Sequence, residues 1–250
     1  DLVCRRRGYY PIGPARLTSA DVFGLFLKSR IAAAPDRLTV YPRLYTMRDL
    51  GLPARQPLGA ARDPRRLFDD PSRPMGLRPY TPETPFKAVA WKATARSGTL
   101  QAKLYEPTVT LKTALFLAVD SFAEPADEAA FELAVSAMAS IADHDLGHRR
   151  PVGIFANGRQ ADTGGPVLLP PGRAPDQRLL ILDHLARLER APTGDFAAFL
   201  DLGLAAAGNG ATLAVLGKSF SAATLLQLQE RQRRGTPVIL LVAGDAPLPR

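Results

Sequence analysis

The chain has a single cysteine, Cys4, among its 250 residues. One thiol excludes an internal disulfide and any metal site built from cysteines alone, and it permits a reducing compartment. No apolar run approaches the roughly 20 residues that a membrane-spanning helix needs. The first residues lack the apolar segment and cleavage site of a secretory signal, and no initiator Met precedes Asp1. We therefore expect a fragment of a longer protein.

Motifs for catalysis and nucleotide binding are also missing. The Gly-x-Ser-x-Gly pattern of serine hydrolases does not occur. Gly217-Lys218-Ser219 has the ending of a phosphate-binding loop, but strand-like apolar residues stand where its glycine cradle belongs. The sequence therefore predicts a protein that is not an enzyme. A hydrolase that uses Asp120 or Glu124 as a general base is the less favoured alternative, because neither has a partnered nucleophile or metal.

Charge is distributed unevenly along a chain of otherwise ordinary globular composition, with 46% apolar and 22% charged residues. Residues 1–112 contain 20 Lys and Arg against 9 Asp and Glu, a net charge of +11, whereas residues 113–250 contain 12 against 15, a net charge of −3. A basic front half suits an anionic membrane surface or nucleic acid. Base-stacking aromatics are sparse there, so we expect no nucleic acid. A solvated arginine-rich surface is the alternative.

The first half of the chain has the pattern of short extended segments and loops. Residues 1–50 alternate short strand-like pieces with turn residues, and their prolines favour a small β-sandwich with edge strands. Residues 51–85 are rich in proline and arginine, which predicts a long loop. We therefore divide this half into a β-rich domain, residues 1–50, and a linker with a signature segment, residues 51–112.

Residues 113–250 alternate strand and helix patterns, which predicts an α/β domain with a parallel sheet wrapped by helices. The apolar run at 114–119 suits a strand buried on both faces. Further strands are expected at 152–155, 166–169, 212–216 and 238–242, and helices at 125–143, 177–189, 195–207 and 222–233. The strands at 152–155 and 166–169 are candidates for a hairpin.

Several landmarks occur in a fixed order. Arg78-Pro79-Tyr80-Thr81-Pro82 leads at fixed spacing to Trp91-Lys92-Ala93-Thr94-Ala95-Arg96, and Arg7-Gly8-x-Tyr10, Asp-Val-Phe-Gly-Leu-Phe at 21–26 and Val-Tyr-Pro at 40–42 precede them. Together they resemble domain-of-unknown-function family 58, although Glu83-Thr84 replaces the family's Gly-Asp. The resemblance implies a von Willebrand factor type A-like domain in residues 113–250. It also implies a non-enzymatic interaction role, with a MoxR-type AAA+ ATPase as the partner.

Type A domains carry a metal loop of the form Asp-x-Ser-x-Ser, and this chain departs from it. Asp120 is followed by Phe122 and Glu124 where the two serines belong, and Gly217-Lys218 replaces a later aspartate. The resemblance places the family's threonine loop at Thr193. A hard cation needs oxygen ligands, so we expect a degenerate site with no metal and no cofactor. Residual binding would use Asp120, Glu124 and Thr193. We expect protein recognition at the strand-end crevice around Asp120 and Thr193.

Two further groups of residues are candidates for contact with partners. Arg78, Tyr80, Trp91, Lys92 and Arg96 combine aromatic rings with cations, which suits either packing at a domain joint or an acidic partner. Arg5, Arg6 and Arg7 are candidates for the membrane surface. The resemblance implies membrane-spanning helices upstream of them, and hence the cytoplasmic face of a bacterial inner membrane. Three outward-facing cations on the first strand are the alternative.

Overall fold

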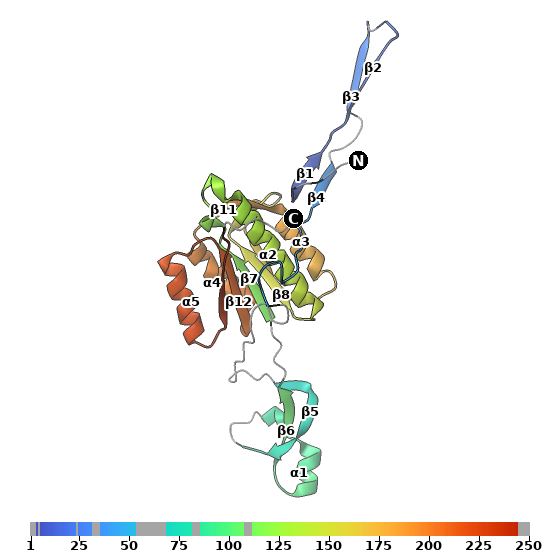
Figure 1. The fold of residues 1–250 in the computed structure, drawn as a ribbon. Helices are drawn as coiled ribbons and strands as arrows, with labels where there is room; N and C mark the ends of the chain where they lie inside the picture. Colours follow the sequence, from blue (N-terminus) through green and yellow to red (C-terminus); the bar gives the residue numbers. More distant parts are fainter. Residues whose placement is uncertain are drawn as a thin grey trace. The chain divides into compact units, whose positions relative to one another are not determined.

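The structure is a computed structural model that describes residues 4, 6–23, 25–31, 36–53, 69–81, 86–107 and 112–244 (Figure 1). Its contacts divide the chain into two compact units. The larger unit combines residues Asp1–Ala61 and Leu111–Arg250, and the smaller unit is Arg62–Thr110. The smaller unit is therefore inserted, in sequence, before the first strand of the large sheet.

The larger unit is built on a five-stranded, mostly parallel sheet with the strand order β10-β8-β7-β12-β13. These strands are β7 (Lys112–Leu117), β8 (Val152–Ala156), β10 (Val167–Gly172), β12 (Ala211–Gly217) and β13 (Val238–Val242). Strands β8, β7, β12 and β13 run parallel to one another, whereas β10, at one edge of the sheet, pairs antiparallel with β8. The predicted mixed α/β fold and the predicted hairpin of two of its strands are confirmed.

Helices cover both faces of this sheet because the side chains of each strand alternate between two cores. The helices are α2 (Glu128–Gly147), α3 (Gln177–Arg187), α4 (Phe196–Ala207) and α5 (Ala222–Arg233). Leu115 and Leu117 of β7 share one buried core with α2 and α3. Phe116 of β7 points to the opposite face, where its ring stacks on Phe155 at 4.7 Å and shares a core with α4 and α5.

The first 40 residues form two antiparallel strand pairs. β1 (Gly8–Ile12) pairs with β4 (Asp36–Val40), and β2 (Arg16–Ala20) pairs with β3 (Leu27–Ile31). The predicted β-sandwich is wrong for the residues that the structure describes. A sandwich needs a buried layer between two sheets, and every residue of β2 and β3 is exposed.

The segment after β4 belongs to the core of the larger unit. The side chain of Met47 is buried against the cluster formed with α2, and Leu50 and Leu52 pack beside it. The backbone N–H of Tyr45 donates to the Ser140 hydroxyl of α2 at 2.9 Å. Residues 1–50 therefore have no separate core, and the expected boundary at residue 50 does not divide two folded bodies.

The smaller unit contains a strand pair and a short helix. β5 (Asp69–Pro79) pairs antiparallel with β6 (Gln101–Pro107), and η1 (Phe86–Ala88) and α1 (Trp91–Ser97) lie between them in sequence. The prediction of a loop is wrong for Asp69–Pro79. Proline is tolerated there because a two-stranded sheet has only edge strands, and the pairing shifts register on both sides of Pro74.

Candidate functional site

A small polar crevice lies at the carboxyl end of the sheet, beside β7 and β12. Within the sheet, β7 has β8 as its neighbour on one side and β12 on the other. The crevice therefore lies at a topological switch point of the strand order, where open α/β sheets bind ligands. The crevice has a volume of about 270 Å³. Its lining consists of Ala118, Asp120, Ser121, Phe196, Ser219, Phe220, Ser221 and Thr224.

Asp120 lines this crevice as predicted, but its carboxylate also has a structural partner. It accepts a hydrogen bond of 3.0 Å from the backbone N–H of Phe196, the first residue of α4. Asp195 accepts from Ala198 within the same turn. A carboxylate at a helix N-terminus is stabilised by the helix dipole and by otherwise unpaired N–H groups. Asp120 therefore joins the loop after β7 to α4.

Phe122 and Glu124, which stand where the motif Asp-x-Ser-x-Ser has its two serines, both make contacts that stabilise the fold. The Phe122 ring is buried and packs edge-on against Phe131 of α2, with 5.7 Å between ring centroids. The Glu124 side chain accepts from the backbone of Asp127, and the Asp127 side chain accepts from the backbone N–H of Glu124 at 3.1 Å. This capping box begins the helical segment that leads into α2.

Lys218 faces the buried carboxylate of Asp127. Its Nζ lies 2.5 Å from Asp127 Oδ1, and this hydrogen bond is the main reason that the pKa of Asp127 lies below its ordinary value. The backbone N–H of Lys218 donates to the Ser121 hydroxyl at 2.9 Å. The loop after β12 is thus held to the loop after β7. The ammonium group of Lys218 also forms an ion pair with the Asp127 carboxylate, directly before the start of α2.

Thr193 does not reach the crevice. Its N–H and hydroxyl both donate to the backbone oxygen of Asn157, at 2.7 and 2.9 Å. The crevice lining therefore includes Asp120 and not Thr193, and protein recognition at this end of the sheet stays a prediction. Asn157 itself was missed by sequence reasoning. Its fully buried side chain accepts from the N–H of Val119 at 2.7 Å and donates to the carbonyl of Gly194 at 2.9 Å. The only sequence signal was an amide directly after an apolar strand.

Arg190 is a second residue that sequence reasoning missed. It lies on β11 (Leu188–Pro192), which pairs with β9 (Gly158–Gln160). Its guanidinium donates to the carbonyls of Phe122 and Glu124 at 2.9 and 2.6 Å and to the Glu128 carboxylate at 3.1 Å. Within the described ranges, no group of three or more His, Cys, Asp or Glu is placed to hold a metal ion. The polar groups around the crevice hold loops together and form no nucleophile–base pair.

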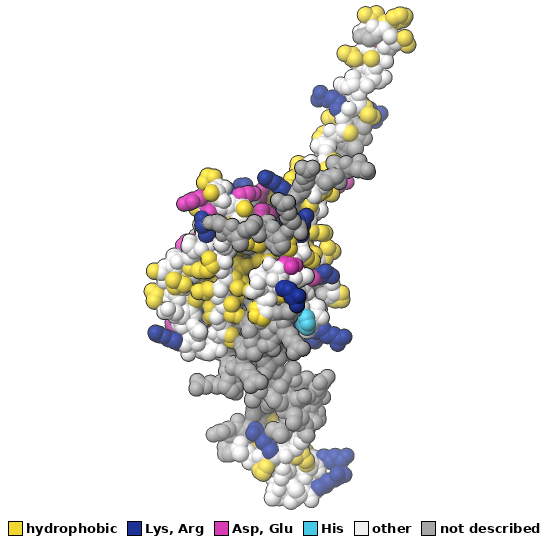
Figure 2. Space-filling model, viewed as in Figure 1, with side chains coloured by type: hydrophobic (Ala, Val, Ile, Leu, Met, Phe, Trp, Pro, Cys, Tyr) yellow, Lys and Arg dark blue, Asp and Glu magenta, His cyan; other side chains and the backbone are white. Residues whose placement is uncertain are grey.

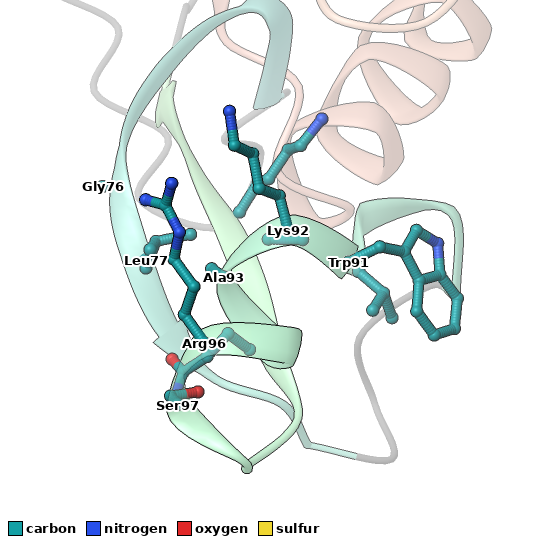
Figure 3. A pocket seen from close by; sticks show the side chains of 11 residues that line it. Gly76, Leu77, Trp91, Lys92, Ala93, Arg96 and Ser97 are labelled. Carbon is teal, nitrogen blue, oxygen red and sulfur yellow. The ribbon is translucent and has the colours of Figure 1, made fainter.

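A larger groove lies in the smaller unit and brings together three residues of the signature segment. Trp91, Lys92 and Arg96 of α1 line it with Lys103 of β6, and its volume is about 790 Å³. Figure 3 shows Lys92 and Arg96 extending over the same side of α1, with Trp91 turned the other way. The Trp91 side chain is 60% exposed. Residues 86–103 contain four Lys and Arg and no Asp or Glu, so the groove is positively charged.

The other two signature residues have different surroundings. The half-buried ring of Tyr80 contacts Phe86 edge-on at 6.5 Å, and Phe86 contacts Trp91 at 5.4 Å, which forms one aromatic row. Arg78 lies on β5 opposite Ala102 of β6, outside the lining of the groove. The structure therefore places Trp91, Lys92 and Arg96 in the lining of the groove, Tyr80 in an aromatic row with Phe86 and Trp91, and Arg78 on the adjoining strand.

The three N-terminal arginines do not form one basic surface. Arg5 lies outside the described residues, and Arg6 is exposed. The side chain of Arg7 is only 5% exposed and lies over the Phe131 ring. It donates to the Glu132 carboxylate at 2.9 Å and to the carbonyls of Leu185 and Leu188 at 2.5 and 2.8 Å. The prediction of a membrane contact is wrong for Arg7, because its side chain is buried and its guanidinium makes three hydrogen bonds inside the larger unit.

Comparisons with known proteins extend this description only a little. The described helices include none long and apolar enough to cross a membrane. No family model and no solved structure matches the chain. The chain is 29% identical over 154 residues to "Uncharacterized protein YeaD" of Bacillus subtilis (strain 168), a match that covers 62% of this chain and 37% of that protein. This chain is thus similar to little more than a third of a longer bacterial protein.

Proposed function

We propose that this chain is a non-enzymatic protein-interaction module that binds an acidic segment of a partner protein in the groove beside α1. The observation that carries the proposal is the exposed Trp91 at the edge of a groove lined by Lys92, Arg96 and Lys103. Tryptophan and arginine are the residues most often responsible for binding energy at protein interfaces. Since residues 86–103 contain no acidic side chain, the complementary partner carries carboxylates next to an apolar residue.

The partner that we propose is a MoxR-type AAA+ ATPase, at the cytoplasmic face of a bacterial inner membrane. The basis is the ordered set of landmarks that resembles domain-of-unknown-function family 58. The five-stranded sheet with helices on both faces is compatible with the von Willebrand factor type A-like domain that the resemblance implies. In this proposal the larger unit is the scaffold and the groove of the smaller unit is the contact site.

A hydrolase is the competing function, and the crevice gives it no support. Asp120 accepts from the first N–H of α4, and Glu124 is part of a capping box. A general base has to reach a nucleophile or water that it activates, and the hydroxyl of Ser121 instead donates to the carbonyl of Ala118 at 2.6 Å. These contacts stabilise loops, which is the role that we assign to them.

The test measures binding of the full chain to a purified MoxR-type ATPase of the same organism by biolayer interferometry. Trp91→Ala, and separately Lys92→Glu with Arg96→Glu, should each weaken binding about 10- to 100-fold, which is the range for central interface residues. The matched control is Arg173→Glu with Arg233→Glu, which makes the same charge change at exposed positions of the larger unit. Equal binding by groove and control variants would refute the proposal.

A further inference from the structure

Five large apolar side chains are exposed where β2 leads into β3, four of them in the connecting loop and one, Leu27, at the start of β3. Val22, Phe23, Leu25, Phe26 and Leu27 are between 73% and 97% exposed. Figure 2 shows apolar side chains gathered at the end of this hairpin. Soluble proteins seldom leave such a cluster in water unless it is an interaction site. We call Val22, Phe23, Leu25, Phe26 and Leu27 the hairpin tip.

The structure holds the hairpin tip together by contacts of Asp21 with Phe26. The backbone N–H of Phe26 donates to the Asp21 carboxylate at 2.7 Å, and the N–H of Asp21 donates to the Phe26 carbonyl at 3.3 Å. Asp21 is the single acidic residue between positions 16 and 31. The Asp21 carboxylate is therefore hydrogen-bonded at the base of the loop. The exposed apolar side chains belong to a loop that these two hydrogen bonds close.

Cations follow the hairpin tip on both strands. Lys28 comes directly after Leu27, Arg30 is two residues further along β3, and Arg16 of β2 lies opposite Ile31. With a rise of about 3.3 Å per residue, Lys28 and Arg30 lie roughly 3 and 10 Å from Leu27 along the strand. An apolar end followed within about 10 Å by the two cations of β3 matches the order of acyl chains and phosphate groups at a membrane surface.

We propose that the hairpin tip inserts into the boundary between headgroups and acyl chains of an anionic bilayer. Every residue of β2 and β3 is exposed, and an isolated two-stranded hairpin is only marginally stable in water. Lipid would cover the apolar tip, while Lys28 and Arg30 pair with phosphates. The two strands have open edges, whose backbone groups cannot enter hydrocarbon. Insertion is therefore confined to the interface, about 5–10 Å deep.

This proposal is independent of the groove and replaces Arg7 as the predicted membrane contact. The test is co-sedimentation of the full chain with vesicles of phosphatidylcholine and phosphatidylglycerol, against vesicles of phosphatidylcholine alone. Phe23→Ser with Phe26→Ser should lower the partition coefficient for anionic vesicles about tenfold or more, because two aromatic side chains no longer leave water. Leu202→Ser with Leu226→Ser removes two exposed apolar side chains of the larger unit and should change nothing.

Two further measurements separate insertion from adsorption. Trp91 is the only tryptophan, so Phe23→Trp in a Trp91→Phe chain places the single indole at the hairpin tip. Its emission should shift to the blue with anionic vesicles and become protected from a soluble quencher. Lys28→Gln with Arg30→Gln should weaken binding and reduce its dependence on salt, because fewer phosphates are neutralised.

Three results would overturn the proposal. The first is binding to anionic vesicles no stronger than to neutral ones, and the second is an indole emission that vesicles do not move. The third is a chain that binds no vesicles but dimerises in sedimentation velocity through the hairpin tip, since a second copy would then cover it. Circular dichroism of the Phe23→Ser, Phe26→Ser chain confirms that a loss of binding is not a loss of folding.

Discussion

Asn157→Ala tests whether one buried amide holds the loops at the carboxyl end of the sheet. The side chain accepts from the N–H of Val119, after β7, and donates to the carbonyl of Gly194, before α4. It is completely buried, and so is Val119. In the alanine variant the N–H of Val119 loses its acceptor. Water cannot replace that acceptor, because Val119 is fully buried.

The expected loss of stability follows from these contacts. Each intramolecular hydrogen bond contributes about 1 kcal/mol net, and a buried donor left unpaired costs about 1–3 kcal/mol. Gly194 is exposed, so water can replace the partner of its carbonyl. The sum is a decrease of about 2–4 kcal/mol in the free energy of unfolding. A decrease of this size places Asn157→Ala among the strongly destabilising substitutions.

Urea denaturation followed by far-ultraviolet circular dichroism measures this decrease. With a slope of about 2 kcal/mol per molar urea, the midpoint should fall by about 1–2 M. Asn209→Ala is the matched control, because Asn209 lies in an exposed turn and should change the free energy by less than about 0.5 kcal/mol. If Asn157→Ala shifts the midpoint no more than Asn209→Ala, the assignment of Asn157 as the joining residue is refuted.

Other predictions concern charged groups of the same unit. Arg7→Ala should lower the free energy of unfolding by about 2–4 kcal/mol in the same urea assay, because Glu132 and two backbone carbonyls lose their donor; no loss would contradict the buried position of Arg7. Because the pKa of Asp127 in the folded chain lies below its unfolded value of about 3.9, its carboxylate form contributes stability above that pH, and the contribution is lost as the pH falls through the folded pKa. Lys218→Met should flatten this acid dependence, measured as urea midpoints from pH 6 downward; an unchanged profile would exclude Lys218 as its cause. Millimolar Mg²⁺, Mn²⁺ or Ca²⁺ should leave the thermal midpoint unchanged, whereas a rise abolished by Asp120→Ala would reveal a metal site.

Local sequence patterns predicted the main strands and helices of residues 113–250, but not the pair of β9 and β11, whose Leu188 was assigned to the preceding helix. The apolar run of β13 was placed at Val238–Val242, and the helix of α5 at Ala222–Arg233, as the structure has them. The residues that set the bounds of β13 and α5 are close to these elements in the sequence. The hydroxyl of Ser221 caps the first turn of α5 by accepting from Thr224, and β13 is a short apolar run after Gly235 and Pro237.

Contacts between distant residues could not be predicted in this way. Arg7 has the sequence context of a basic surface, and it is buried by contacts with residues more than 120 positions away, among them Glu132, Leu185 and Leu188. The crevice is a mixed case. Analogy with other open α/β sheets placed both Asp120 and Thr193 there. Asp120 does line the crevice, whereas Thr193 lies outside the lining and directs both of its donors to the backbone oxygen of Asn157. Nothing near Thr193 in sequence indicates that contact.

The position of the smaller unit has a consequence for synthesis of the chain on the ribosome. Met47 packs against α2, which ends at Gly147, 100 residues later, and the inserted unit lies between them in sequence. At about 5–20 residues per second, translation leaves Met47, Leu50 and Leu52 without their packing partners for roughly 5–20 s. During that interval these side chains are available to chaperones and proteases, while the inserted unit has already emerged. Completion of the larger unit is thus a late event in the making of this protein.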